Sequence, residues 1–205
     1  MIHNSAMVDD SAKLESSCQV WANSTIREGV RIGANTSVGI GSYVGPDVTI
    51  GSNCKIQNGA YLYEPCSVGD GVFIGPRVVF TNDKSPRAIK PSGEQIRAGD
   101  WEPVGVTVKE GASIGAMVVC VAPVTIGKWS MIAAGSVIIN EVPDYALVAG
   151  SPAKRIGWVG RAGKRLTRSN SGWVCPVNGD TYTEDEDGSH LILDSEKHNS
   201  PVEGK

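Results

Sequence analysis

The sequence predicts an all-β fold, a parallel β-solenoid in which a six-residue repeat is the structural unit. A large apolar residue returns at every sixth position, at Ile2, Val8, Leu14, Val20, Ile26, Ile32, Val38, Val44, Ile50, Ile56, Leu62, Val68, Ile74 and Phe80. A small or β-branched residue stands two positions before most of these anchors, and Gly often follows them. A period of six fits neither an amphipathic helix, with its period of about 3.6, nor a strand, with its period of about 2.

Each repeat is expected to supply one short strand and one corner, so that three repeats form a triangular coil of about eighteen residues. The anchors point inward, and successive coils stack as parallel strands about 4.8 Å apart. The same pattern explains most cysteines: Cys18, Cys54 and Cys66 fall on the small inward position and Cys120 on an anchor. No CxxC spacing occurs, and we expect no metal. Cys175 lies outside the repeat and receives no role.

Length and charge narrow the function classes. The chain has 205 residues, of which 40% are hydrophobic and 6% aromatic, which predicts one globular domain and a tail. The net charge of −3 leaves no basic surplus, so we expect no nucleic-acid partner. No stretch reaches the roughly eighteen apolar residues of a membrane span, and no leader pattern opens the chain. We therefore expect a cytoplasmic protein without membrane insertion.

The repeat defines a β-helix domain over residues 1–143 with one interruption. After Phe80 the segment 81–107 has no period of six, and the anchors resume at Val108. Long loops in compact folds usually carry function, so this excursion loop is expected to line a site. Residues 144–168 are predicted to cap the last coil and to cover its strand edges. The polar, acidic residues 169–205 are predicted to form a mobile tail.

Several stretches within residues 1–166 carry a family resemblance. They are KIQNGAYLYEP, GDGVFIGPRVVFTND, the later PR, GASIGAMVVCVAPVTIG and VPDYALVAGSPAKRIGWV. Together with the repeat they resemble the hexapeptide-repeat acyltransferases, and among these the N-acetyltransferases of UDP- or dTDP-linked 3-amino sugars. The resemblance implies a left-handed parallel β-helix, acetyl-CoA as donor, and a homotrimer with active sites between subunits. It also suggests a role in cell-surface polysaccharide synthesis.

The histidines support an amine as acceptor. His3 is near the N-terminus, and His190 and His198 lie in the predicted tail, so neither the repeat nor its loop contains one. A γ-class carbonic anhydrase of this fold needs three His ligands, and the O-acyltransferases of the fold use a His base. A neutral amine needs no base to begin its attack.

The resemblance assigns the catalytic position to Asn82, in FTND, as the residue that holds the amine; its simpler interpretation is an Asn that tolerates a loop-entry conformation. Substrate-binding candidates lie on the matching stretches: Lys55, Gln57, Tyr63, Glu64, Lys84 and Arg87. Small residues for the pantetheine arm and a polar turn for the CoA phosphates are expected at Gly115, Ala116, Ala133, Ala134, Ser151, Lys154 and Arg155. Small residues at corners and a solvated cationic pair are also ordinary features of such repeats.

Two other functions stay open at this point: an acyltransferase of the same fold with another acceptor or acyl donor, and a non-catalytic β-solenoid scaffold. The loop and the GSPAKR segment favour an enzyme, because scaffolds tend to keep regular repeats throughout. The residues do not distinguish UDP from dTDP, nor a uronate from a 6-deoxyhexose.

Overall fold

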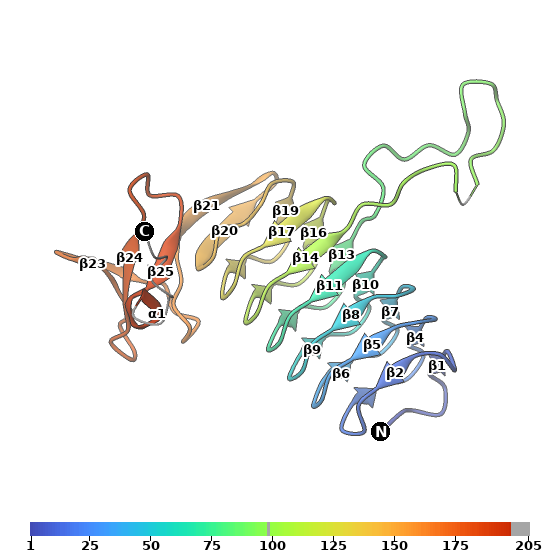
Figure 1. The fold of residues 1–205 in the computed structure, drawn as a ribbon, viewed down its shortest axis with the longest axis horizontal. Helices are drawn as coiled ribbons and strands as arrows, with labels where there is room; N and C mark the ends of the chain where they lie inside the picture. The colour runs from blue at the N-terminus through green and yellow to red at the C-terminus, as the bar shows by residue number, and fades with distance from the viewer. Residues whose placement is uncertain (98, 198–205) are drawn as a thin grey trace, which may run out of the picture.

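The computed structural model describes residues 1–97 and 99–197, with the side chains of residues 196 and 197 left out. It has the predicted left-handed parallel β-helix, with a projecting loop and a small terminal sheet (Figure 1). Three sheets form the sides of the prism, named here by their first strands: the β1 sheet, the β2 sheet and the β3 sheet. Met7 pairs with Thr25 and Lys13 with Arg31, so one coil is one predicted set of three repeats.

The strands are short, and consecutive strands along the chain fall into the three sheets in turn. The β1 sheet contains β1 (Met7–Val8), β4 (Thr25–Ile26), β7 (Tyr43–Val44), β10 (Tyr61–Leu62), β13 (Val79–Phe80), β16 (Val119–Cys120) and β19 (Val137–Ile138). The β2 sheet contains β2 (Lys13–Leu14), β5 (Arg31–Ile32), β8 (Thr49–Ile50), β11 (Cys66–Val68), β14 (Val106–Val108) and β17 (Val124–Ile126). The β3 sheet contains β3 (Gln19–Val20), β6 (Ser37–Val38), β9 (Lys55–Ile56), β12 (Phe73–Ile74), β15 (Ser113–Ile114), β18 (Met131–Ile132), β20 (Ala146–Gly150) and β21 (Ala153–Trp158).

The anchors fill the interior as predicted. Ile26, Leu62, Ile74 and Phe80 are fully buried, and burying each such side chain contributes about 1.5–3 kcal/mol before entropy is subtracted. The four cysteines of the repeat are free and buried in this core. Burial raises the pKa of Cys120 to about 12 and raises that of Cys66 as well, so these thiols are packing groups.

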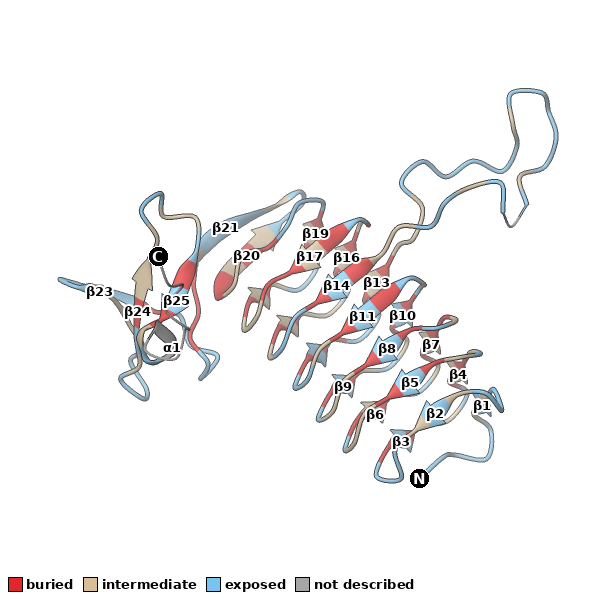
Figure 2. Ribbon diagram, viewed as in Figure 1, coloured by how far each residue is buried: buried red, intermediate tan, exposed pale blue. Residues whose placement is uncertain are grey.

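The excursion loop occupies residues 81–105, two residues fewer than predicted. It leaves after β13 and ends where β14 begins, because Cys66 and Ser67 of β11 already pair with Val106 and Thr107. Most of the loop is exposed (Figure 2). Its base is closed by one backbone hydrogen bond, from Val104 N to Asn82 O at 2.9 Å. The loop therefore projects from one edge of the prism without disturbing its register.

The prediction of a mobile tail from residue 169 is wrong for the described residues. A four-stranded antiparallel sheet follows the cap, formed by β22 (Thr167–Ser169), β23 (Gly172–Val174), β24 (Thr181–Glu184) and β25 (Leu191–Leu193), and α1 (Asp194–Lys197) ends it. Cys175, Tyr182 and Leu193 are buried, and the rings of Tyr182 and Tyr145 meet at 5.1 Å. A few apolar residues set among acidic ones were enough to pack the sheet on the cap. Residues 198–205, with His198, lie outside the described residues.

Among the described residues, no helix has the length and apolar character needed to cross a membrane.

Candidate active site

Asn82 lies at the root of the loop, on the edge between the β1 and β2 sheets. Leu62 pairs with Phe80 of the next coil, and Glu64 and Asn82 each follow this pair by two residues. Glu64 and Asn82 therefore lie at the same edge on successive coils. The structure brings these two predicted site residues together because the strand before each corner has the same register.

Aromatic side chains cover the same edge. The rings of Tyr63 and Tyr43 meet at 5.2 Å, and Arg27 donates from Nη1 to the Tyr43 hydroxyl at 3.3 Å. Arg27 also pairs with Glu28 at 2.8 Å. Sequence reasoning named Tyr63 and missed Tyr43 and Arg27. The eighteen-residue coil places Thr25, Tyr43 and Tyr61 beside one another on successive turns, and Arg27 follows Thr25 by two residues.

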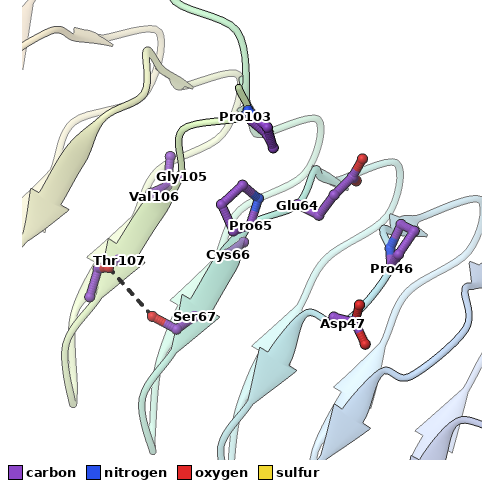
Figure 3. A pocket seen from close by; sticks show the side chains of 10 residues that line it. All are labelled: Pro46, Asp47, Glu64, Pro65, Cys66, Ser67, Pro103, Gly105, Val106 and Thr107. Atoms are coloured by element: carbon purple, nitrogen blue, oxygen red, sulfur yellow. Dashed lines mark hydrogen bonds between the residues drawn. The ribbon is translucent and has the colours of Figure 1, made fainter. Parts of the chain in front are cut away.

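A pocket of about 480 Å³ opens at the loop base (Figure 3). Its lining comes from three coils: Pro46, Asp47, Glu64, Pro65, Cys66, Ser67, Pro103, Gly105, Val106 and Thr107. Three prolines make much of its wall apolar, and Glu64 and Asp47 supply carboxylates. One carboxylate oxygen of Glu64, Oε2, is buried and has no hydrogen-bond partner among the described residues.

The other substrate candidates are dispersed. Lys84 and Arg87 are exposed in the loop, and Arg87 donates from Nη1 to the Pro86 carbonyl at 2.9 Å. Lys55 points outward from β9, and Gln57 lies on the corner between the β3 and β1 sheets. The structure therefore does not bring Lys55 and Gln57 to Asn82 within one chain.

The small residues expected for CoA stack on that second corner, the β3/β1 edge. Gly115 and Ala116 follow β15, and Ala133 and Ala134 follow β18 one coil later. The coils touch closely: Gly135 N donates to Ala116 O at 2.8 Å, and a Cβ on Gly115 would lie 2.6 Å from Ala134 N. Because the side chains at this edge are small, an extended ligand such as the pantetheine arm of CoA could approach the backbone.

The predicted phosphate contacts lie beyond this stack. Ser151 is exposed in the turn between β20 and β21, and Lys154 is exposed on β21. Arg155 lies over the Trp158 ring at 4.1 Å and donates from Nη1 to Gly188 O at 2.8 Å. Its guanidinium is thus held by the terminal sheet, which leaves Lys154 as the more available cation of the pair.

The two predicted half-sites lie on different edges. The two edges are separated by residues 117–121, which cross the β1 sheet. This length of extended chain spans roughly 15–20 Å. In a single chain, Asn82 and the small-residue stack therefore lie on different edges and do not form one site.

One group of potential metal ligands occurs among the described residues: Asp185, Asp187 and His190, whose ligand atoms lie within 4.8 Å of one another. It lies in the terminal sheet, far from the loop (Figure 1). The backbone N–H of His190, followed by the Ser189 hydroxyl, lowers the pKa of Asp185 to about 2 despite some desolvation. These hydrogen bonds close the turn between β24 and β25.

Comparison with known proteins agrees with the repeat. The family model "Bacterial transferase hexapeptide (six repeats)" matches residues 29–63 and 47–82. Residues 29–82 therefore carry the repeat of the hexapeptide-repeat transferases. The product of the BC4754 gene of Bacillus cereus has the same fold, at 22% identity and a TM-score of 0.61 over 77% of this chain and 86% of that one.

Two curated relatives bear on the acceptor. A dTDP-3-amino-3,6-dideoxy-alpha-D-galactopyranose 3-N-acetyltransferase of Aneurinibacillus thermoaerophilus is 46% identical over 68 residues, 33% of this chain and 35% of that protein. Serine acetyltransferase of Haemophilus influenzae is 34% identical over 109 residues, 53% of this chain and 38% of that protein. The matches thus span little more than a third of these two relatives.

Proposed function

We propose that the protein transfers the acetyl group of acetyl-CoA to the amino group, at C3, of a UDP- or dTDP-linked amino sugar destined for cell-surface polysaccharide. The observation that carries this proposal is the 46% identity to a dTDP-3-amino-sugar 3-N-acetyltransferase. The exposed aromatic rings at the loop base and the loop cations Lys84 and Arg87 support a nucleotide-sugar, since rings stack on bases and cations pair with phosphates.

Acetyl transfer to an amine needs no histidine base at the edge between the β1 and β2 sheets. The neutral amine attacks the thioester carbonyl, a C–N bond forms, and the C–S bond breaks as the intermediate collapses. The surplus N–H proton passes to the departing CoA sulfur. Asn82 Oδ1 accepts a hydrogen bond from the amine and orients its lone pair, a positioning effect worth about 100-fold or more in rate.

A homotrimer would unite the two half-sites, and the β1 sheet supports one. Its outward side chains are mainly apolar or aromatic: Tyr43, Tyr61, Val79, Val119 and Val137. The outward side chains of the β2 sheet are polar: Lys13, Arg31, Thr49, Ser67, Thr107 and Thr125. An apolar sheet face gains free energy when another subunit covers it. The Asn82 edge of one subunit then meets the small-residue edge of its neighbour.

A hydroxyl acceptor is the second candidate, favoured by the likeness to serine acetyltransferase. A hydroxyl requires a general base, and no histidine occurs between residues 4 and 189 to serve as one near the loop. The amine therefore remains the better acceptor. A scaffold without catalysis would explain neither the loop nor the pocket.

The test is release of free thiol from acetyl-CoA with a panel of UDP- and dTDP-linked 3-amino sugars, and a blank without acceptor to correct for the protein's own cysteines. Turnover with one panel member is expected. Turnover with L-serine and with no amino sugar would replace the proposal by the second candidate, and absence of both CoA binding and turnover would favour a scaffold.

A further inference from the structure

The β3/β1 edge has a left-handed residue at the same corner position on successive coils. The backbone N–H of that residue donates to the coil before it, as Arg77 N does to Asn58 O at 3.0 Å and Met117 N to Pro76 O at 2.9 Å. Gly and Asn accept this conformation readily, whereas long side chains are strained in it. From coil to coil the position is occupied by Asn23, Gly41, Gly59, Arg77, Met117 and Gly135, with φ between 57° and 71°.

Packing within the chain explains the other bulky left-handed residues but not Arg77 and Met117. Of the eight described residues other than Gly with positive φ, four are Asn or Asp, which tolerate it. The Trp129 ring packs against Gly111, and Tyr145 is buried in the core. Arg77 and Met117 are exposed, so little packing offsets their strain. Strain of this kind is typical of functional positions.

Of these two residues, only Arg77 lacks a role. Met117 follows Ala116 in the small-residue stack, where the expected pantetheine arm accounts for an exposed apolar side chain. Arg77 extends the other way: its Cγ lies 3.5 Å from the place of a Cβ on Gly59, one coil toward the N-terminus. The CoA phosphates are expected beyond the opposite end of the stack, at Lys154. Arg77 is therefore directed toward the acceptor and away from those phosphates.

The guanidinium of Arg77 is available for an anion. It is exposed, and it makes no hydrogen bond, ion pair or ring contact in the part of the chain that the structure describes. Arg77 precedes β13 and Asn82 follows it, so the two residues lie on one coil at either side of the β1 sheet. A threefold axis along the prism keeps residues at their level, so in the proposed trimer Arg77 of one subunit comes to the Asn82 edge of its neighbour.

Resting on the proposed function and its trimer, we propose that Arg77 binds an oxyanion group of the acceptor, either the diphosphate or a sugar carboxylate. The planar fork of a guanidinium pairs with two oxygens of either group. The left-handed corner directs the side chain over Gly59 and toward the acceptor, which accounts for a strained Arg where Gly or Asn would be more stable.

Three variants separate charge from conformation. Arg77→Asn removes the cation and installs a residue that accepts positive φ, as Asn23 does on the same edge. Its Kd for the acceptor is expected to rise about 10-fold or more, with an unchanged KM for acetyl-CoA and a thermal midpoint equal to or above that of the wild type. Arg77→Lys keeps a charge without the fork and is expected to lose less affinity. Arg31→Thr removes the same charge from the β2 sheet, where Thr49 pairs with it on the next coil, and is the matched control.

Calorimetry measures the binding of two acceptors, a 3-amino uronate and the 3-amino hexose with a hydroxymethyl group in place of the carboxylate. Each is linked to the nucleotide that the thiol-release panel selects. An equal loss of affinity for both acceptors in Arg77→Asn would assign the cation to the diphosphate. A loss confined to the uronate would assign it to the carboxylate.

The remaining outcomes are separable. Wild-type affinity of folded Arg77→Asn for both acceptors, when the wild type acetylates them, would overturn the role of Arg77 and leave the proposed function standing. A loss of affinity that comes with a lower thermal midpoint, or that Arg31→Thr shares, would also overturn it. A wild type that neither binds nor acetylates any member of the panel would overturn both proposals.

Discussion

Asn82 is fixed by its backbone more than by its side chain. Its carbonyl accepts from Val104 N at 2.9 Å and closes the loop base, while its side chain is half-buried. A substitution that keeps the backbone should therefore preserve the fold and remove the amide. This separation makes the residue suitable for testing the chemistry alone.

Asn82→Ala is expected to lower kcat/KM for the amino sugar by about 100-fold or more, because the amine loses its positioning partner. The thermal midpoint and the oligomeric state should stay those of the wild type. Steady-state thiol release, scattering and calorimetric unfolding measure the three quantities. Near-normal turnover in the folded variant would remove Asn82 from the site.

Asp185 is expected to make the stability of the terminal sheet depend on pH. Its pKa is lowered to about 2 from 3.8, first by the His190 backbone N–H, so it stabilises the folded state fully above about pH 4. That contribution is lost as the pH falls from about 4 toward 2. Asp185→Asn should weaken the sheet at neutral pH and flatten its acid titration, followed by the fluorescence of Trp173. An identical titration in wild type and variant would contradict the assignment.

The loop is an insertion that the coils do not need. β11 and β14 pair directly across it, so the register of the prism is complete without residues 83–103. Closing a shorter loop costs slightly less entropy, by about 0.6 kcal/mol for each halving of length.

Replacing residues 83–103 with a short Gly-Ser linker should therefore leave the thermal midpoint unchanged or slightly higher. Acetyl transfer should fall below detection, because Lys84, Arg87 and one wall of the pocket are removed. An active loopless protein would show that the nucleotide-sugar binds elsewhere. A protein that fails to fold would contradict the independence of loop and coils.

The elements differ in how far sequence predicts them. The anchors from Ile2 to Phe80 repeat without a gap, so the coils were predictable from period alone. Cys175, Tyr182 and Leu193 have no such repetition; they belong to one buried cluster with the distant Tyr145 and Trp158, in which the Tyr182 ring contacts that of Tyr145. Composition over the last residues therefore predicted a tail where packing forms a sheet.

At the scale of the whole molecule, strand register puts the two predicted site residues Asn82 and Glu64 at one edge. The motif did not predict that Gln57 and the small-residue stack lie on another edge, because that depends on which corner each hexapeptide turns. The motif also did not predict that Arg155 donates a hydrogen bond to Gly188 O, because the terminal sheet was not expected.

The β1 face tests the assembly. Val119→Asp places a charge among its outward apolar side chains and is expected to convert a trimer into monomers with activity lost, because a buried unpaired charge is costly. Thr49→Asp on the polar β2 face is the control and should leave the mass unchanged. Multi-angle light scattering measures both. An active wild-type monomer would contradict the shared site.

The central proposal, that the acceptor is the amine of a nucleotide-linked 3-amino sugar, is tested most directly by the product itself. The protein is incubated with carbonyl-labelled acetyl-CoA and dTDP-3-amino-3,6-dideoxygalactose, and the acetylated position is read by carbon NMR. An amide at C3, formed at a rate above the uncatalysed reaction, is the predicted result. An ester at a sugar hydroxyl, or no product with this and the UDP-linked amino sugars, would contradict it.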